Sequence, residues 1–260
     1  MRPSIAIVGM GRLGTALAQG LSEAGYKVSK ISRGSPRSAE LTAYIVWFCV
    51  PDGKIQRTAT SFSEANWAGK IAFHSSGVLT SDALNSLQRA GANVASVHPL
   101  MTFVKGSVPE LAAVPFAIEG DRAAVSAAKK IARDLGAAPV AIRKKDKVAY
   151  HAFATMICPL LVSLLAASEK VAALGGIPER EARRRMMPII RQTLRNYQKL
   201  GPAGAFSGPI VRGDVETIRE HLSVMKSIPA AKNAYATLAK TALEFLPNRN
   251  REKMMRLLAQ

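Results

Sequence analysis

The chain has 260 residues, 48% of them apolar, which is enough for one large domain or two modest ones, and two are expected. A formal charge of +18 suits anionic ligands, but the basic residues are dispersed and aromatic residues make up only 6%, so no nucleic-acid partner is expected. Only Cys49 and Cys158 are present, which argues against a disulfide framework or a zinc site.

The N-terminal stretch predicts a strand, a tight turn and a helix. Ile5–Val8 is a short apolar run, it ends in Gly9-x-Gly11-x-x-Gly14, and apolar residues then recur at helical spacing as far as Leu21. Gly9 would make the turn, Gly11 would let a pyrophosphate approach the backbone, and Gly14 would let the helix pack on the strand. The pattern predicts a dinucleotide site that includes Arg12 and Leu13 at the helix N-terminus; the alternative is a merely tight turn.

The segment after the second predicted strand, Lys27–Ile31, indicates which dinucleotide is bound. An acidic residue about 20 positions after the glycine motif usually meets a free ribose 2′-OH. This chain instead reads Ser32-Arg33-Gly34-Ser35, with hydroxyls and a guanidinium that suit a 2′-phosphate. NADP is therefore favoured over NAD, with contacts expected from Ser32, Arg33 and Ser35. The alternative is an ordinary basic surface loop.

Polar residues follow the next three predicted strands, Ala43–Val50, Lys70–Phe73 and Asn93–Val97. The first ends in Val50-Pro51-Asp52, the second in His74-Ser75-Ser76-Gly77, and the third in His98-Pro99. Ligands of open parallel sheets bind outside the carboxyl ends of the strands. The residues expected to border the cofactor are Val50, Pro51, Asp52, His74 and Ser75.

The remaining elements predict an α/β domain followed by an all-helical one. Predicted helices at residues 55–62, 79–90 and 122–135 and strands at 115–118 and 139–142 complete a doubly wound parallel sheet. From Asp146 onward strand patterns end, and helices are predicted at residues 147–174, 178–200 with a kink at Pro188, 214–225, 229–245 and 251–258. The expected domains are residues 1–145, which bind the nucleotide, and 146–260, which bind the substrate and a second copy.

No membrane association is expected. The apolar stretch Ala152–Ala167 has 16 residues, contains Pro159, and is too short to span a bilayer. Met1-Arg2-Pro3 leads directly into the first strand and leaves no room for a signal sequence. These features favour a cytoplasmic protein.

One polar loop interrupts the helical region. It reads Ser207-Gly208-Pro209-Ile-Val-Arg212-Gly213-Asp214. The guanidinium of Arg212 suits a carboxylate of the substrate, and the alternative is a loop-stabilising ion pair with Asp214. For Asp214 an N-cap is the favoured role.

These motifs occur in an order that resembles the family of Rossmann-like and DUF2520 domain-containing proteins. The resemblance rests on the glycine motif, His98-Pro99-Leu100, Tyr150-His151 and the Ser207–Asp214 loop, and it covers nearly the whole chain. The family is similar to the group of 6-phosphogluconate dehydrogenase, ketopantoate reductase, pyrroline-5-carboxylate reductase and imine reductases. The resemblance implies an NADP-binding domain, a 6-phosphogluconate dehydrogenase-like helical domain and a homodimer with an interdomain active site; it implies no particular substrate.

Three residues are candidates for the proton donor of a hydride transfer. β-Hydroxyacid dehydrogenases, which the chain resembles, carry Lys-x-x-Asn-Asn with a proton-donating Lys; here Lys147-Val-Ala-Tyr150-His151 keeps the spacing and loses the amides. Lys147 and His151 are therefore candidates. His98, at the end of a predicted strand, is the third. The histidines lack metal-ligand spacing, so no metal is expected.

The expected function is an NADP-dependent oxidoreductase that transfers a hydride to a C=O or C=N group. The substrate would be small, anionic and carboxylated, with ketopantoate-like chemistry as one example. The alternative is a non-catalytic NADP-binding sensor or assembly protein. A weaker alternative, nucleic-acid binding through the +18 charge, predicts affinity that falls steeply with salt.

Overall fold

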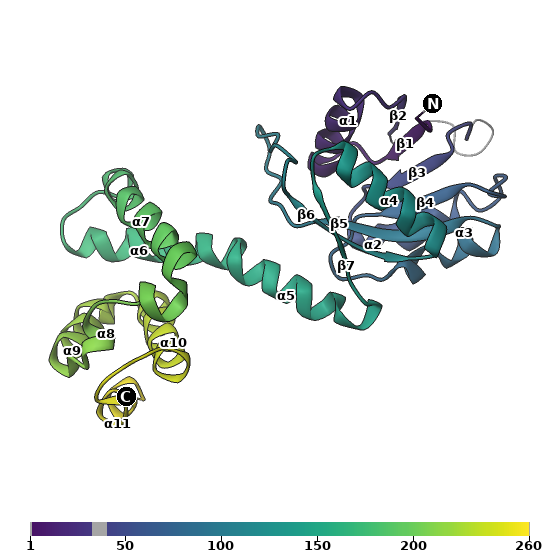
Figure 1. The fold of residues 1–260 in the computed structure, drawn as a ribbon. Coiled ribbons are helices and arrows are strands. Elements are labelled where there is room, and N and C mark those ends of the chain that lie inside the picture. Colours follow the sequence, from purple (N-terminus) through teal and green to yellow (C-terminus); the bar gives the residue numbers. More distant parts are fainter. Residues whose placement is uncertain (1, 33–40, 260) are drawn as a thin grey trace. The chain divides into compact units, whose positions relative to one another are not determined.

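The computed structural model describes residues 2–32 and 41–259. The chain divides into two units, Met1–Cys158 and Pro159–Gln260. Strands and helices alternate in the first unit, and the second is all-helical (Figure 1). The domain limits expected from the sequence place residues 146–158 in the second domain, whereas the division of the structure into units places them in the first.

Seven strands form one sheet in the first unit. They are β1 (Ile5–Val8), β2 (Val28–Ile31), β3 (Ile45–Phe48), β4 (Ile71–His74), β5 (Asn93–Pro99), β6 (Pro115–Gly120) and β7 (Ala138–Ala141), in the spatial order β2-β1-β3-β4-β5-β6-β7. The strand order changes direction between β1 and β3, and such switch points are where open α/β sheets bind ligands. The predicted doubly wound, Rossmann-like fold is confirmed.

The last two strands differ from the predicted parallel arrangement. β1 to β5 pair in parallel, but β6 pairs antiparallel with β5, and β7 runs parallel to β6. Residues 100–114, which connect β5 to β6, contain no helix. A parallel connection needs a crossover, usually a helix, so this segment returns the chain in the opposite direction.

Helices cover both faces of the sheet. α1 (Arg12–Glu23) and α4 (Arg122–Asp134) pack on the face that contains Trp47. On the other face, which contains Phe48, lie α2 (Asp52–Thr60), the 3₁₀ turn η1 (Ser81–Leu84) and α3 (Asn85–Arg89). Strands β1, β3 and β4 are buried at every residue, as expected for parallel strands covered on both sides.

The predicted helix 147–174 is two helices, α5 (Lys147–Ile157) and α6 (Pro159–Leu174). Cys158 between them leaves the helical region of backbone angles, with φ −119° and ψ −81°. Pro159 explains the break, because proline has no N–H to donate and its ring clashes with the preceding turn. The prediction of one continuous helix is therefore wrong at this point.

The second unit continues with five more helices and a short 3₁₀ turn. They are α7 (Glu179–Ala205), α8 (Pro209–Arg212), α9 (Val215–Val224), η3 (Met225–Ser227), α10 (Pro229–Phe245) and α11 (Arg251–Leu258). α7 stays helical through Pro188, where a kink was expected, and its backbone leaves helical angles at Gly201, where φ is 70°. Ile218, Leu243 and Met254 bring α9, α10 and α11 into one core.

One segment passes the length and composition test for a membrane-spanning helix. It is Lys144–Leu174, with a mean hydropathy of 1.8 and none of its most apolar window buried. The core helices of soluble proteins pass the same test, so a single segment of this kind is weak support for a membrane span. The segment comprises η2, α5 and α6, and exposed apolar helices of this kind also suit an interface between protein subunits.

Candidate active site

The turn after β1 has three glycines, and each meets different surroundings. Gly9 has φ +99°, and a side chain there would lie 2.8 Å from Val50 Cγ1. A Cβ at Gly14 would lie 2.0 Å from the carbonyl oxygen of Gly9. A Cβ at Gly11 would meet no atom of the described residues within 4 Å, so they leave its backbone open to a ligand. The geometry fits the expected arrangement of a tight turn, an approachable backbone and a closely packed helix.

The start of α1 gives this turn its anion-binding character. Gly11 precedes the helix, and Arg12, Leu13 and Gly14 begin it. The first amides of an α-helix have no acceptor within the helix and point toward a bound anion. Ser32 lies nearby because Ile31 at the end of β2 accepts a hydrogen bond from Gly9 N–H at 3.0 Å. The other two residues expected at the 2′-phosphate, Arg33 and Ser35, lie outside the described residues.

The segment after β3 borders the same turn. The Cys49 N–H donates to the Val8 carbonyl at 2.8 Å, and this bond sets Val50 beside Gly9. Pro51 and Asp52, which follow, are exposed at the start of α2. The Asp52 carboxylate also accepts a hydrogen bond from Ser76 Oγ at 2.7 Å. Asp52 thereby connects the glycine turn to the loop after β4.

His74 and Ser75 shape that loop with their own side chains. His74 is fully buried; its Nε2 lies 2.9 Å from the Thr80 carbonyl, and its Nδ1 accepts from Ser76 N–H at 3.1 Å. Burial lowers the pKa of His74 to about 4, so the ring is neutral. Ser75 Oγ accepts from the Trp47 indole N–H at 2.7 Å. Both side chains are occupied within the protein, so they shape the loop where cofactor contacts were expected.

Lys147, on the first turn of α5, is buried to 1% exposure. Its amino group donates to Ser96 Oγ at 2.8 Å and to the Ser76 carbonyl at 3.1 Å. Burial lowers the pKa of Lys147, although the carboxylates of Glu119 and Asp52 partly oppose the shift. An amine held in this way loses its proton more readily than a surface lysine.

The two histidine candidates stand beside Lys147. His98 near the end of β5 and His151 on α5 have ring centroids 6.0 Å apart, nearly at right angles. Gly77 makes room for both rings, because a Cβ there would lie 2.3 Å from His151 Cδ2 and 2.9 Å from His98 Nε2. Burial and the nearby Lys147 lower the pKa of His98 to about 4. Lys147, His98 and His151, chosen from the sequence, therefore lie together at one edge of the sheet.

Tyr150 lies on the same face of α5 and was not among the predicted site residues. Residues three and four apart share a helix face, which places Tyr150 and His151 one turn beyond Lys147. The Tyr150 and His98 rings meet edge to face with centroids 6.1 Å apart. The Tyr150 hydroxyl and His98 Nδ1 are both buried and have no hydrogen-bond partner among the described residues.

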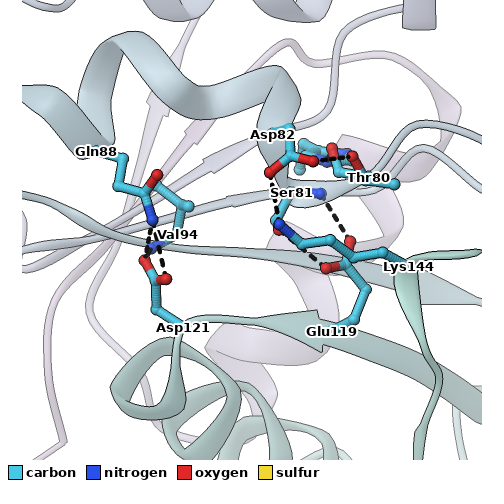
Figure 2. A network of polar contacts seen from close by, with 9 residues as sticks. Thr80, Ser81, Asp82, Gln88, Val94, Glu119, Asp121 and Lys144 are labelled. Carbon is cyan, nitrogen blue, oxygen red and sulfur yellow. Dashed lines mark hydrogen bonds and ion pairs between the residues drawn. The ribbon is translucent and has the colours of Figure 1, made fainter.

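A polar network fixes the loop and the start of α5 (Figure 2). Glu119 on β6 is buried and accepts from the Ser81 N–H at 2.6 Å and the Ser81 hydroxyl at 2.9 Å. Asp82 pairs with Lys144 in the 3₁₀ turn η2 (Lys144–Asp146) directly before α5. The network joins β6, the loop after β4 and the N-terminal end of α5, which holds Lys147.

Arg212, the candidate for binding a substrate carboxylate, lies in the second unit. It is exposed at the end of α8. Asp214 accepts from Thr217 N–H at 3.2 Å as the N-cap of α9, which confirms its favoured role. Among the ion pairs of the described residues, none joins Arg212 to Asp214, so the guanidinium remains a candidate for an external anion.

Sequence reasoning missed three polar residues of the first-unit cluster, namely Ser76, Ser96 and Tyr150. The available indication was a hydroxyl inside a buried strand at Ser96 and a tyrosine one helical turn after Lys147. Among the described residues, no group of three His, Cys, Asp or Glu side chains is placed to hold a metal ion. Two surface pockets, of about 400 and 480 Å³, contain none of the residues of this cluster; one lies beside α1 and the other within the helical unit.

Two family models match the chain. The one described as domain of unknown function (DUF2520) matches residues 114–242. The one described as NADP oxidoreductase coenzyme F420-dependent matches residues 4–45, which hold the glycine turn. A comparison with curated proteins finds no match.

Solved structures show the same fold at low sequence identity. A candidate NADP oxidoreductase from Bacteroides fragilis has a TM-score of 0.77 and 20% identity, over 92% of this chain and 97% of that one. A protein from Thermotoga maritima has a TM-score of 0.70 and 23% identity over the same shares. An imine reductase from Pseudomonas sp. has a TM-score of 0.66 and 18% identity, over 99% of this chain and all of that one.

The family expected from the sequence is confirmed by these matches. The NADP oxidoreductase model covers the first strand, the glycine turn and the first helix, and the DUF2520 model extends from β6 into α10. The chain therefore belongs to the Rossmann-like proteins that contain a DUF2520 domain, with a nucleotide-binding unit of the NADP oxidoreductase type.

Proposed function

We propose that the protein is an NADP-dependent reductase that transfers a hydride to the C=O or C=N carbon of a small carboxylated compound. The observation that carries the proposal is that one edge of the sheet holds both the glycine turn and the buried Lys147 cluster. Asp52 links the two parts through its hydrogen bond with Ser76. Bound NADPH would supply the hydride, so the protein needs to orient both reactants and provide a proton.

The residues of the first unit divide this work. Gly9, Gly11, Gly14 and the amides at the start of α1 fit a diphosphate, and Val50 and Pro51 border the same turn. Lys147, with its lowered pKa, is suited to exchange a proton, and His98 and His151 line the same place. The matched model and an imine reductase from Myxococcus stipitatus, solved with NADP⁺, support NADP as the nucleotide.

The substrate is proposed to carry a carboxylate. Arg212 is the candidate for this group, because a guanidinium binds a carboxylate with two parallel hydrogen bonds. Ketopantoate-like compounds would meet both requirements, a reducible carbonyl and a carboxylate. Residues 1–145 would then bind the nucleotide, and 146–260 the substrate and a second copy of the chain.

The homodimer is proposed from the exposed apolar residues of α5 and α6. Met156 is 67% exposed, Leu160 53% and Val162 62%. Apolar side chains gathered along helices in this way usually mark an interface. A protein that works with NADPH on a small metabolite would act in the cytoplasm, which is the compartment we propose.

The test of the nucleotide is a comparison of thermal stabilisation by NADPH and by NADH. A ligand that binds only the folded state raises the melting temperature. NADPH should give the larger shift, and Arg33→Ala should reduce that shift while leaving the NADH shift nearly unchanged. Equal shifts from both nucleotides would contradict the assignment of the 2′-phosphate contacts.

The test of the reaction is NADPH oxidation with a panel of keto acids, ketones and cyclic imines. Oxidation with at least one of them, lost in Lys147→Met, supports the reductase. Tight NADPH binding without oxidation across the panel would instead favour a non-catalytic NADP-binding sensor or assembly protein.

A further inference from the structure

Two adjacent aromatic side chains each have a buried polar atom that no described residue pairs with. They are Tyr150 on α5 and His98 on β5, whose rings meet edge to face at 6.1 Å. The third such atom among the described residues, Ser86 Oγ, lies apart from them on α3. Buried polar atoms in folded proteins are almost always paired, so two neighbouring exceptions point to a partner that the described residues do not supply, such as a bound ligand.

Lys147 is not suited to be the first residue of this group that a ligand contacts. Its amino group is buried and already donates to Ser96 Oγ and the Ser76 carbonyl. Tyr150, one turn further along the same helix face, and His98 are only half-buried as residues, although their unpaired polar atoms are buried. A ligand that enters the cluster therefore meets Tyr150 and His98 before it reaches Lys147.

The pair is uncharged near neutral pH, which limits the ligand. Burial raises the pKa of the Tyr150 hydroxyl above its usual value. Burial also lowers the pKa of His98 to about 4, with help from Lys147 and His151, whereas Asp52 opposes the shift. A neutral hydroxyl beside a neutral imidazole suits an uncharged oxygen or nitrogen better than a carboxylate.

We propose that the Tyr150 hydroxyl and His98 Nδ1 form the subsite that binds the uncharged carbonyl or imine group of the substrate. Tyr150 donates a hydrogen bond to the oxygen or nitrogen of this group, and His98 Nδ1 forms a second hydrogen bond with the same group. The assignment of the bound group as the reacting one rests on the proposed reductase function. The subsite also separates two parts of the substrate, because the carboxylate must then bind elsewhere.

The first measurement compares the melting temperatures of the wild type, Tyr150→Phe and Tyr44→Phe without ligand. A buried hydroxyl without a hydrogen bond does not stabilise the folded state, because its desolvation is not compensated. Tyr150→Phe should therefore melt at or slightly above the wild-type temperature. Tyr44, 47% exposed in the same unit, is the matched control for loss of a tyrosine hydroxyl. A clear drop for Tyr150→Phe but not for the control would show an internal partner and overturn the proposal.

The second measurement uses cyclohexanone, an uncharged ketone, with protein saturated with NADP⁺ so that no turnover occurs. Its dissociation constant should rise at least tenfold in Tyr150→Phe and stay unchanged in Tyr44→Phe. His98→Gln should weaken binding similarly, while His98→Asn, which keeps a polar atom near the position of Nδ1, should retain most of it. Equal affinity in wild type and Tyr150→Phe, or no binding by the wild type, would overturn the subsite.

These results are separable from the fate of the reductase proposal. Absence of NADPH oxidation across the substrate panel would refute the reaction, while cyclohexanone binding and its loss in Tyr150→Phe would still establish the subsite. Conversely, turnover that is unaffected by Tyr150→Phe would retain the reductase and refute the subsite.

Discussion

The glycines of the first turn differ at the scale of single atoms. A Cβ at Gly14 would collide with the Gly9 carbonyl oxygen at 2.0 Å, which is backbone and cannot move aside. Gly11 has φ −78° and open space around it, so alanine fits there without strain. Glycine is thus required for packing at position 14, whereas packing among the described residues does not require it at position 11.

This contrast gives a paired prediction. Gly14→Ala should destabilise the first unit by about 3 kcal/mol or more, as overpacking against backbone does. Gly11→Ala should change stability by less than about 1 kcal/mol and weaken NADPH binding at least tenfold, because its methyl group occupies the path of the diphosphate. Urea unfolding and NADPH titration measure the two effects. Normal NADPH affinity in Gly11→Ala would show that the diphosphate lies elsewhere.

The buried histidines make stability depend on pH. The pKa of His74 and of His98 is about 4 in the folded protein and near 6.5 in an unfolded chain. Between these values the unfolded chain binds more protons, so the free energy of unfolding rises with pH and is lost as pH falls from about 6.5 toward 4.

We therefore expect the urea midpoint to fall between pH 6.5 and pH 4.5, and to fall less in His74→Asn, which removes one of the two titrating rings. Fluorescence isolates the first unit, because the two tryptophans of the chain, Trp47 and Trp67, are both buried there. His221→Asn in the second unit is the control and should leave this slope unchanged. An identical slope in His74→Asn and wild type would mean that other groups cause the loss.

At the scale of elements, a polar network joins β6 to η1 through Glu119 and Ser81, and η1 to the 3₁₀ turn before α5 through Asp82 and Lys144. The two carboxylate oxygens of Glu119 accept hydrogen bonds from the N–H and the hydroxyl of Ser81 inside the protein. Asp82 and Lys144, in contrast, form an ion pair at the surface. Because only the first interaction is buried, the two should contribute differently to the free energy of unfolding. A buried carboxylate that loses an acceptor leaves a donor unpaired, whereas a surface ion pair is screened by water.

Glu119→Gln should accordingly destabilise the first unit by about 1–3 kcal/mol. Asp82→Asn, the matched surface change, should cost less than about 1 kcal/mol. Glu119→Gln should also lower the pKa of Lys147 further, because Glu119 partly opposes the effect of burial. Denaturant unfolding and the pH dependence of NADPH oxidation measure the two consequences. Equal destabilisation by both variants would indicate that Glu119 has no special role in this network.

Element types and their order were predictable from the sequence, but two features of the connections were not. The alternation of strands and helices predicts the sheet, yet apolar periodicity contains no information on strand direction. The absence of a helix in residues 100–114 was the available indication that β6 reverses. The break at Cys158 followed from Pro159, which the apolar pattern on both sides concealed.

The candidate site was predictable only where a local pattern encodes it. The glycine turn is contiguous, so its geometry followed from spacing. Lys147 was found through the resemblance of its motif to that of β-hydroxyacid dehydrogenases, and His98 as a titratable residue at the end of a predicted strand. Tyr150 and Ser96 join the site through contacts between β5 and α5, which no spacing in the sequence reports.

At the scale of the whole molecule, the charge and the apolar surface suggest different partners. The formal charge of +18 suits the anionic nucleotide and the carboxylated substrate that we propose. The apolar residues of α5 and α6, by contrast, suit a protein surface of the same kind. A closed dimer would cover such a surface with the same residues from a second copy, because a twofold interface is self-complementary.

Val162→Glu tests this proposal. A charge in the centre of an apolar interface costs several kcal/mol when it is desolvated, so the variant should dissociate at concentrations where the wild type is a dimer. Sedimentation equilibrium gives the mass of each, with the 27.8 kDa chain as the reference. Val104→Glu is the matched control, since Val104 is similarly exposed at 51% but lies in the loop between β5 and β6. A monomeric wild type, or equal dissociation of both variants, would remove α6 from the interface.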